Sequence, residues 1–278
     1  MINNIAYYPL QCARNSGPVL TAFLNSCRAA GINPVQNSLD CDAVVIWSVL
    51  WNGRMAENEA VYRHYRSLNK PVFVIDVGAL KRGVTWKIAL NNINALGDYG
   101  NGFRDPDRPR KLGIALKNRA KTNENIIVAT QHIKSEQVAH IDYKNWPEQM
   151  VRNIYNTVSD RLVLIRHHPR CPMGFDGAEI EVPQKLPGTY DDFDINVGCH
   201  AMVNFNSGPA IQAAIAGCPI VCDKTSLAYP VSIKLEELEN PPEKDRSEWL
   251  IDICHTEYTV DEIESGLWLK NIRESIKT

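Results

Sequence analysis

Apolar and polar positions alternate in two different ways along the N-terminal part of the chain. Compact apolar runs at residues 2–8, 42–47 and 72–76 have the length and composition of buried strands. Residues 17–30 and 56–68 instead carry apolar side chains at the spacing of one helix face. Strands that alternate with helices imply right-handed crossovers and a parallel sheet. The pattern therefore predicts a Rossmann-like domain, with ligands expected beyond the carboxyl ends of its strands.

The same alternation returns in the second half of the chain. Apolar runs at residues 125–131, 161–166 and 201–205 predict three more buried strands, and residues 147–158 predict a helix. Residues 259–272 are rich in apolar and aromatic side chains and predict a closing helix. We therefore expect a second parallel α/β sheet.

The segment between the two halves breaks this rhythm. Residues 91–121 are rich in Asn, Gly, Pro and charged side chains, so we place a domain boundary here, between residues 1–120 and 121–278. From residue 104 to residue 121, seven basic residues stand against two acidic ones, a net charge of +5. Such a segment is either a solvated connection between domains or a surface for an anionic partner such as DNA phosphates. Both interpretations stay open.

Residues 200–223 (HAMVNFNSGPAIQAAIAGCPIVCD) read as a strand, a tight turn, a short helix and a second strand. Asn206 and Ser207 are residue types that cap helices, Gly208 permits a close backbone approach, and Gly217 ends the helix. A turn of this kind points backbone N–H groups and the positive end of a helix beyond the sheet. The unit predicts a phosphate site.

A second polar cluster follows the strand at residues 161–166. The sequence His-His-Pro-Arg at residues 167–170 is expected at the same edge of the sheet as the turn after residue 205. Arg166 or Arg170 can hold an oxygen pair, and a histidine can donate to a phosphate. The alternatives are that the histidines are structural and that Asn-Ser-Gly only caps a helix.

Composition and charge narrow the classes of function. The chain has 278 residues, 44% of them hydrophobic and 22% charged, which is typical of a globular protein. A net charge of −2 and a pI near 6.4 give no overall attraction to nucleic acid, so such a partner needs the local basic segment. Neither a signal peptide nor a membrane-spanning run is evident, and we expect a cytoplasmic protein.

Cysteine and histidine positions do not predict a metal site. The eight cysteines lack CxxC pairing, and we interpret them as buried thiols. One group that the fold can bring together matches no standard zinc spacing: His167, His168, Cys171, Cys199 and His200. We predict no metal.

Three segments resemble glycosyltransferases of the GT-B architecture, in particular the bacterial sialyltransferase and capsule Kdo-transferase-like group and related phage enzymes. They are IRHHP at residues 165–169, NSGPAIQAAIAGCPIV at residues 206–221 and, more weakly, the tail at residues 249–268. The resemblance implies two Rossmann-like domains that face a cleft, with a closing C-terminal helix. It also implies an acceptor domain at residues 1–120 and a nucleotide-sugar donor domain at residues 121–278.

The resemblance also implies roles for individual residues. Asp76 would act as general base and His168 would assist the leaving phosphate, with a UDP- or CMP-linked sugar as co-substrate and no other cofactor. Asp76 can instead simply cap the turn that follows its strand. The residues expected to bind the donor are Gln131, Arg166, His167, His168, Arg170, His200, Asn206, Ser207, Gly208 and Gln212. Gln212 stands where many nucleotide-sugar enzymes place an acidic residue on the ribose.

For the acceptor we favour a hydroxymethylated pyrimidine in phage DNA, because the resemblance extends to phage enzymes and the segment after residue 104 is basic. A phage-encoded enzyme would act in the host cytoplasm. The residues expected to bind DNA are Arg54, Arg82, Arg104, Arg108, Arg110 and Lys111. The alternatives are a capsule or lipopolysaccharide sugar as acceptor, a sugar-nucleotide 2-epimerase, and a non-catalytic nucleotide- or polysaccharide-binding protein. The sequence leaves the oligomeric state open.

Overall fold

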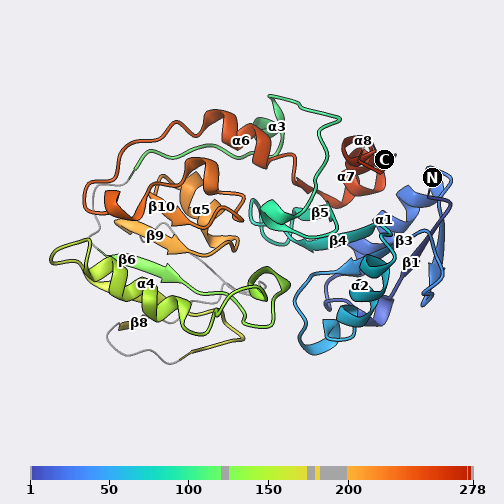
Figure 1. Ribbon diagram of the computed structural model, residues 1–278. Helices are drawn as coiled ribbons and strands as arrows, with labels where there is room; N and C mark the ends of the chain where they lie inside the picture. Colours follow the sequence, from blue (N-terminus) through green and yellow to red (C-terminus); the bar gives the residue numbers. More distant parts are fainter. Residues whose placement is uncertain (1, 120–124, 174–178, 182–198, 274, 277–278) are drawn as a thin grey trace. The chain divides into compact units, whose positions relative to one another are not determined.

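The computed structural model describes residues 2–119, 125–173, 179–181, 199–273 and 275–276. The chain forms two compact units, each built on its own sheet (Figure 1). The first unit contains Met1–Arg108 and Asp252–Thr278, and the second contains Pro109–Ile251. In the described part of the chain, no helix is both long enough and apolar enough to cross a lipid bilayer.

The sheet of the first unit is parallel in its central strands and antiparallel at one edge. Its strand order is β11 (Glu257–Tyr258), β5 (Trp86–Leu90), β4 (Val72–Val77), β3 (Ala43–Trp47), β1 (Asn4–Tyr7) and β2 (Asn33–Gln36). The strands predicted from apolar runs are confirmed as β1, β3 and β4, whereas β2, β5 and β11 were not predicted. The β2 sequence NPVQ is half exposed, and β11 has only two residues, so neither carries an apolar run.

Helices cover both faces of this first sheet. Phe23 of α1 (Gly17–Ala29) packs with Phe73 and Ile75 on one face. On the opposite face, Tyr65 of α2 (Asn58–Ser67) packs among the alternate residues of β3 and β4. This is the doubly wound arrangement that alternating strands and helices predict.

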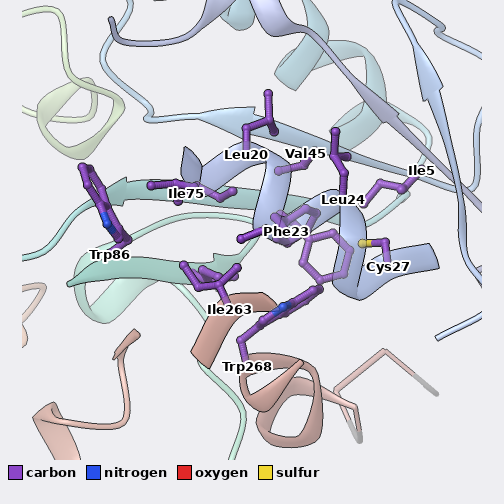
Figure 2. Close-up of a cluster of buried hydrophobic side chains, with 14 of the residues drawn as sticks. Ile5, Leu20, Phe23, Leu24, Cys27, Val45, Ile75, Trp86, Ile263 and Trp268 are labelled. Carbon is purple, nitrogen blue, oxygen red and sulfur yellow. The ribbon is translucent and has the colours of Figure 1, made fainter. Parts of the chain in front are cut away.

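The C-terminal segment packs on the first unit, on the α1 side of the sheet (Figure 2). The Trp268 ring stacks on Phe23 with centroids 4.5 Å apart, and the Trp268 indole N–H donates to Ser26 Oγ at 3.0 Å. The expectation that residues 252–278 belong with the second domain therefore differs from the observed packing. The predicted single closing helix is also broken into α7 (Val260–Glu264) and α8 (Leu267–Ile272), because Gly266 between them has a φ of 73°.

The sheet of the second unit is entirely parallel. Its strand order is β10 (Ile220–Cys222), β9 (Ala201–Asn204), β6 (Ile126–Ala129), β7 (Val163–Arg166) and β8 (Glu179–Glu181). Four of these strands fall within the predicted runs. The α-helices described for this unit include α4 (Trp146–Tyr155) and α5 (Pro209–Ile215). Two more cross its boundaries with the first unit, α3 (Arg108–Lys111) and α6 (Ser247–Ile253). The predicted α/β class with two Rossmann-like sheets is confirmed.

Strand register aligns the carboxyl ends of the central strands in the second sheet. Ala129 of β6 lies opposite both Arg166 of β7 and Asn204 of β9. The residues that follow these three positions therefore emerge side by side. We call the loops after β6, β7 and β9 the second-sheet edge.

Candidate functional site

The second-sheet edge is a hydrogen-bonded group of polar side chains from three strands. Thr130 connects two of them, because its N–H donates to the Arg166 carbonyl at 2.9 Å and its Oγ1 accepts from the His168 N–H at 3.1 Å. Gln131 connects the third, because its Oε1 accepts from the Asn206 N–H at 3.3 Å. Most of these residues are buried, so their positions are fixed by the fold.

Three histidines at this edge share one hydrogen-bonding pattern. The Nδ1 atom of His132 accepts from the Lys134 N–H, that of His168 from the Arg170 N–H, and that of His167 from the Met173 N–H, at 3.1, 3.2 and 3.2 Å. A backbone N–H can only donate, so Nδ1 is the unprotonated nitrogen in each case. In the neutral ring the proton is then on Nε2. The backbone thus fixes the same tautomer in all three rings.

Burial keeps two of these rings neutral at pH 7. It lowers the pKa of His132 below the usual 6.5, and the nearby Lys134 and Arg170 charges lower it further. Burial also lowers the pKa of His167. The His132 and His168 rings are in contact, with centroids 5.4 Å apart at 78°. Neutral imidazoles of this tautomer offer N–H donors, which suit an anionic ligand.

Asn206 and Ser207 do not cap the helix as the sequence suggested. The first turn of α5 has no side-chain cap. Asn206 Nδ2 instead donates to Thr225 Oγ1 at 2.9 Å, and Ser207 Oγ accepts from Asn204 Nδ2 at 2.6 Å. The Asn206 bond joins the loop after β9 to the loop after β10, whereas the Ser207 bond is local and ties the turn to the last residue of β9.

His200 does not join this edge, which corrects its expected role. It directly precedes β9, at the amino end of the strand, whereas Asn206 and Ser207 follow the carboxyl end. The ring is buried, and its Nε2 bonds to the Leu238 carbonyl at 2.6 Å. His200 therefore has a structural role.

The other residues expected to bind the donor differ in exposure. Arg166 is buried, Arg170 is exposed, and Gln212 is half-buried in α5, with Gly208 at the start of that helix. The sequence did not identify Thr130 and His132. Their position could have identified them, because they come at or just after the end of an apolar run, as His167 and His168 do.

Asp76 is the penultimate residue of β4 and lies at the carboxyl end of that strand. Its Oδ2 accepts from Ser48 Oγ at 3.3 Å and its Oδ1 accepts from the Val77 N–H at 2.7 Å. Ser48 adopts a φ of 61°, and its own N–H donates to the Ile75 carbonyl at 2.7 Å. The half-buried carboxylate is thus held by the strand that carries it and by the loop after β3.

The environment of Asp76 favours proton uptake. Burial raises the pKa of Asp76, and the charge of Lys87, the Val77 N–H, Ser48 and the Arg82 charge act in the opposite direction. A half-buried aspartate with a raised pKa has the properties of a general base.

The predicted basic surface is only partly available. Arg108 is 2% exposed, and its guanidinium pairs with both oxygens of Glu262 at 2.8 and 2.9 Å. It also donates to the carbonyls of Cys254 and Glu257. Arg108 therefore fixes the C-terminal segment on the first unit and is too deeply buried to bind DNA, contrary to the expectation.

The remaining basic residues are on the surface. Arg104 bonds to Asp252 at 2.9 Å and is about half exposed, and Arg119 donates to the Pro241 carbonyl at 3.2 Å. Four further residues that were expected to bind DNA are also exposed: Arg54, Arg82, Arg110 and Lys111. Within the described ranges, no three His, Cys, Asp or Glu side chains are grouped as metal ligands would be.

Comparison with known proteins gives similarity of fold. No protein-family model matches the chain, and no curated protein matches its sequence. The β Kdo 2,4 transferase of KpsC from Thermosulfurimonas dismutans is similar with a TM-score of 0.54 and 10% identity, over 92% of this chain and 90% of that one. The β Kdo 2,7 transferase of the same KpsC covers 98% and 99% with a TM-score of 0.47 and 12% identity. The chain therefore has an α/β fold of the GT-B class.

Proposed function

We propose that this protein is a glycosyltransferase that moves a sugar from a nucleotide-sugar donor to a hydroxyl acceptor. In this proposal the second unit binds the donor and the first unit activates the acceptor. The fold supports the proposal in general terms, because the similar structure with the higher TM-score is a Kdo transferase.

The observation that carries the proposal is the second-sheet edge. His132, His167 and His168 have their Nε2–H tautomer fixed by the backbone, next to Ser207 and the start of α5. N–H and O–H donors that are already in place stabilise the charge that develops on a leaving phosphate, at little cost in reorganisation. We assign His168 to this role because it is the half-buried member of the three.

Asp76 is the proposed general base. Deprotonation of an acceptor hydroxyl needs a carboxylate that is ionised at the working pH and basic enough to take the proton. Ser48 and the Val77 N–H orient the carboxylate, and partial burial makes it more basic. The alternative, that Asp76 only caps its own turn, predicts no effect on turnover when the charge is removed.

The acceptor that we propose to test first is a hydroxymethylated pyrimidine in DNA. Arg54, Arg82, Arg110 and Lys111 remain exposed and can contact phosphates, whereas Arg108 cannot. A base in duplex DNA would have to be flipped out of the stack to reach a carboxylate. A saccharide acceptor requires none of these basic residues.

The test is to incubate the protein with UDP- and CMP-linked sugars, including CMP-Kdo, together with hydroxymethylated DNA, plain DNA or oligosaccharides. Nucleotide release and the mass of the acceptor are measured. Release that depends on modified DNA supports the DNA acceptor, and release that depends on an oligosaccharide supports a saccharide acceptor. Isomerised sugar without an acceptor would indicate an epimerase. Nucleotide binding without release for any pair would indicate a binding protein and contradict the proposal.

A further inference from the structure

A row of ionisable side chains crosses three strands in the first sheet. Asp76 of β4 lies directly opposite Lys87 of β5, and Lys87 lies directly opposite Glu257 of β11. Residues directly opposite each other on antiparallel strands point to the same face. Lys87 is 4% exposed and Glu257 is fully buried, while Asp76 remains half-buried. The half-buried Asp76 thus has a buried lysine next to it on the neighbouring strand.

The opposite face of these strands is apolar, so the row is a local exception. Trp86 and Ile88, on either side of Lys87, lie in the core with Phe23, as Figure 2 shows for Trp86. Burial of a lysine is unfavourable unless its charge is compensated. Lys87 has carboxylates on both neighbouring strands, and its Nζ donates to Asn94 Oδ1 at 3.4 Å.

Glu257 holds the turn between β4 and β5. Its carboxylate accepts from the Ala79 N–H at 2.6 Å, the Leu80 N–H at 3.0 Å and Thr85 Oγ1 at 2.7 Å. These bonds fix the turn that joins β4 to β5. A side chain at position 78 would place its Cβ 2.3 Å from Glu257 Oε2, so the arrangement requires Gly78. Because Glu257 is engaged by the turn, the Asp76 carboxylate is the less satisfied of the two neighbours of Lys87.

We propose that Lys87 is a positioning residue for the reaction: its buried ammonium keeps the Asp76 carboxylate ionised and therefore able to accept the proton of the acceptor hydroxyl. This inference rests on the proposed function in one respect, the role of Asp76 as base. The link between Lys87 and the charge of Asp76 stands on the geometry of the sheet alone.

The other groups around Asp76 do not supply a buried positive charge. The Arg82 charge is exposed on the turn, and Ser48 provides a neutral hydroxyl from the loop after β3. Glu257 and the buried Tyr99 hydroxyl are close enough to interact electrostatically. Neither a carboxyl group nor a phenol can supply positive charge, so neither favours ionisation of Asp76. Of the groups named here, Lys87 is the one that is both positively charged and buried, so it can offset the desolvation of the Asp76 carboxylate.

The test compares Lys87→Met and Lys87→Arg with the unchanged protein in two measurements. The first is the titration of the Asp76 carboxyl carbon by NMR, identified by its absence in Asp76→Asn. The second is the pH profile of turnover with the active donor and acceptor pair. We expect Lys87→Met to move the Asp76 titration and the acidic limb of the profile to higher pH by about one unit or more. Lys87→Arg keeps the positive charge, so the Asp76 titration and the acidic limb should stay where they are in the unchanged protein.

Thr85→Val is the matched control, because it removes a bond to Glu257 in the same buried cluster without changing any charge. It should leave the Asp76 titration in place. A Lys87→Met titration that does not move would overturn the inference, as would activity that falls equally at every pH. If no donor and acceptor pair is turned over, the proposed function fails, and the NMR titration still decides whether Lys87 controls the charge of Asp76.

Discussion

The two sheets present opposite kinds of chemistry at their edges. The edge of the first sheet has Asp76 with the buried charges of Lys87 and Glu257 behind it. The second-sheet edge has neutral imidazoles, amides and hydroxyls, joined by hydrogen bonds between the loops after β6, β7 and β9. One edge can take up a proton, and the other can donate hydrogen bonds to an anion.

This difference follows from how each sheet ends. The antiparallel strands β5 and β11 fix the charged row of the first sheet by direct register. The second sheet is parallel throughout, so its strand ends point the same way and its loops gather neutral polar groups. The mechanism that we propose for glycosyl transfer uses both a base and an anion site. If the two tasks are separate, substitutions at Asp76 should change proton transfer only, and substitutions at the second-sheet edge should change donor binding only.

Replacing Asp76 by Asn should have the largest effect. The amide keeps the size of the side chain and can still bond Ser48 and the Val77 N–H, but it cannot take a proton. We expect turnover to fall by about 10²- to 10⁴-fold, with donor affinity unchanged. Steady-state kinetics and calorimetric titration of the donor check this. Asp40→Asn, at an exposed site of the same unit, is the control, and equal turnover in both variants would remove Asp76 from the site.

Arg108 is a second buried basic residue of the first unit, and we expect its role to be structural. Arg108→Ala leaves Glu262 half-buried without its partner, and we expect a loss of about 3–5 kcal/mol in the free energy of unfolding. Arg110→Ala, at an exposed position, should cost less than about 0.5 kcal/mol. Urea unfolding checks both. A stable Arg108→Ala that binds DNA more weakly would restore the role expected from the sequence.

The sequence was informative about strands with continuous apolar runs and uninformative about strand pairing. DAVVIW and VFVID predict β3 and β4 because both faces of these strands are covered. The β5 sequence WKIAL contains Lys87 between apolar residues. Only the strand register shows that this lysine lies opposite Asp76. Pairing of this kind depends on the buried Glu257, far along the chain, and local pattern does not reveal it.

The candidate donor site shows the same limit. Position after a strand correctly placed His167, His168 and Ser207 at one edge, because parallel strands end together. The helix-cap role of Asn206 and Ser207 was wrong, because Thr225 on the next loop and Asn204 at the end of β9 bond to these side chains instead. His200 was misplaced because it was grouped with the site by residue type, although its position before the run at residues 201–205 put it at the amino end of the strand.

His168→Ala should weaken donor binding without changing proton transfer. Loss of a hydrogen bond to a charged phosphate typically costs about 1.5–3 kcal/mol, or roughly a 10- to 150-fold rise in the dissociation constant. Calorimetric titration with the active nucleotide sugar measures it. His140→Ala, an exposed histidine of the same unit, should bind the donor normally. If His168→Ala moves the acidic limb of the pH profile instead, the two edges do not have separate tasks.

The smallest effect is expected for His200, whose substitution should change the pH dependence of stability and leave donor binding unchanged. Burial lowers the pKa of His200, as it does for His132 and His167, so the folded protein keeps these rings neutral while the unfolded chain takes up protons near 6.5. Their contribution to stability is therefore complete above about pH 6.5 and is lost as the pH falls through the folded values. His200→Gln places an amide N–H where Nε2 lies, so it can still donate to the Leu238 carbonyl, and it does not titrate. It should therefore lose less stability between about pH 7.5 and about pH 5.5. Urea unfolding at the two pH values measures this difference. Donor affinity should stay unchanged, because His200 lies at the opposite end of β9, and weaker donor binding in this variant would contradict the assignment of His200 to structure.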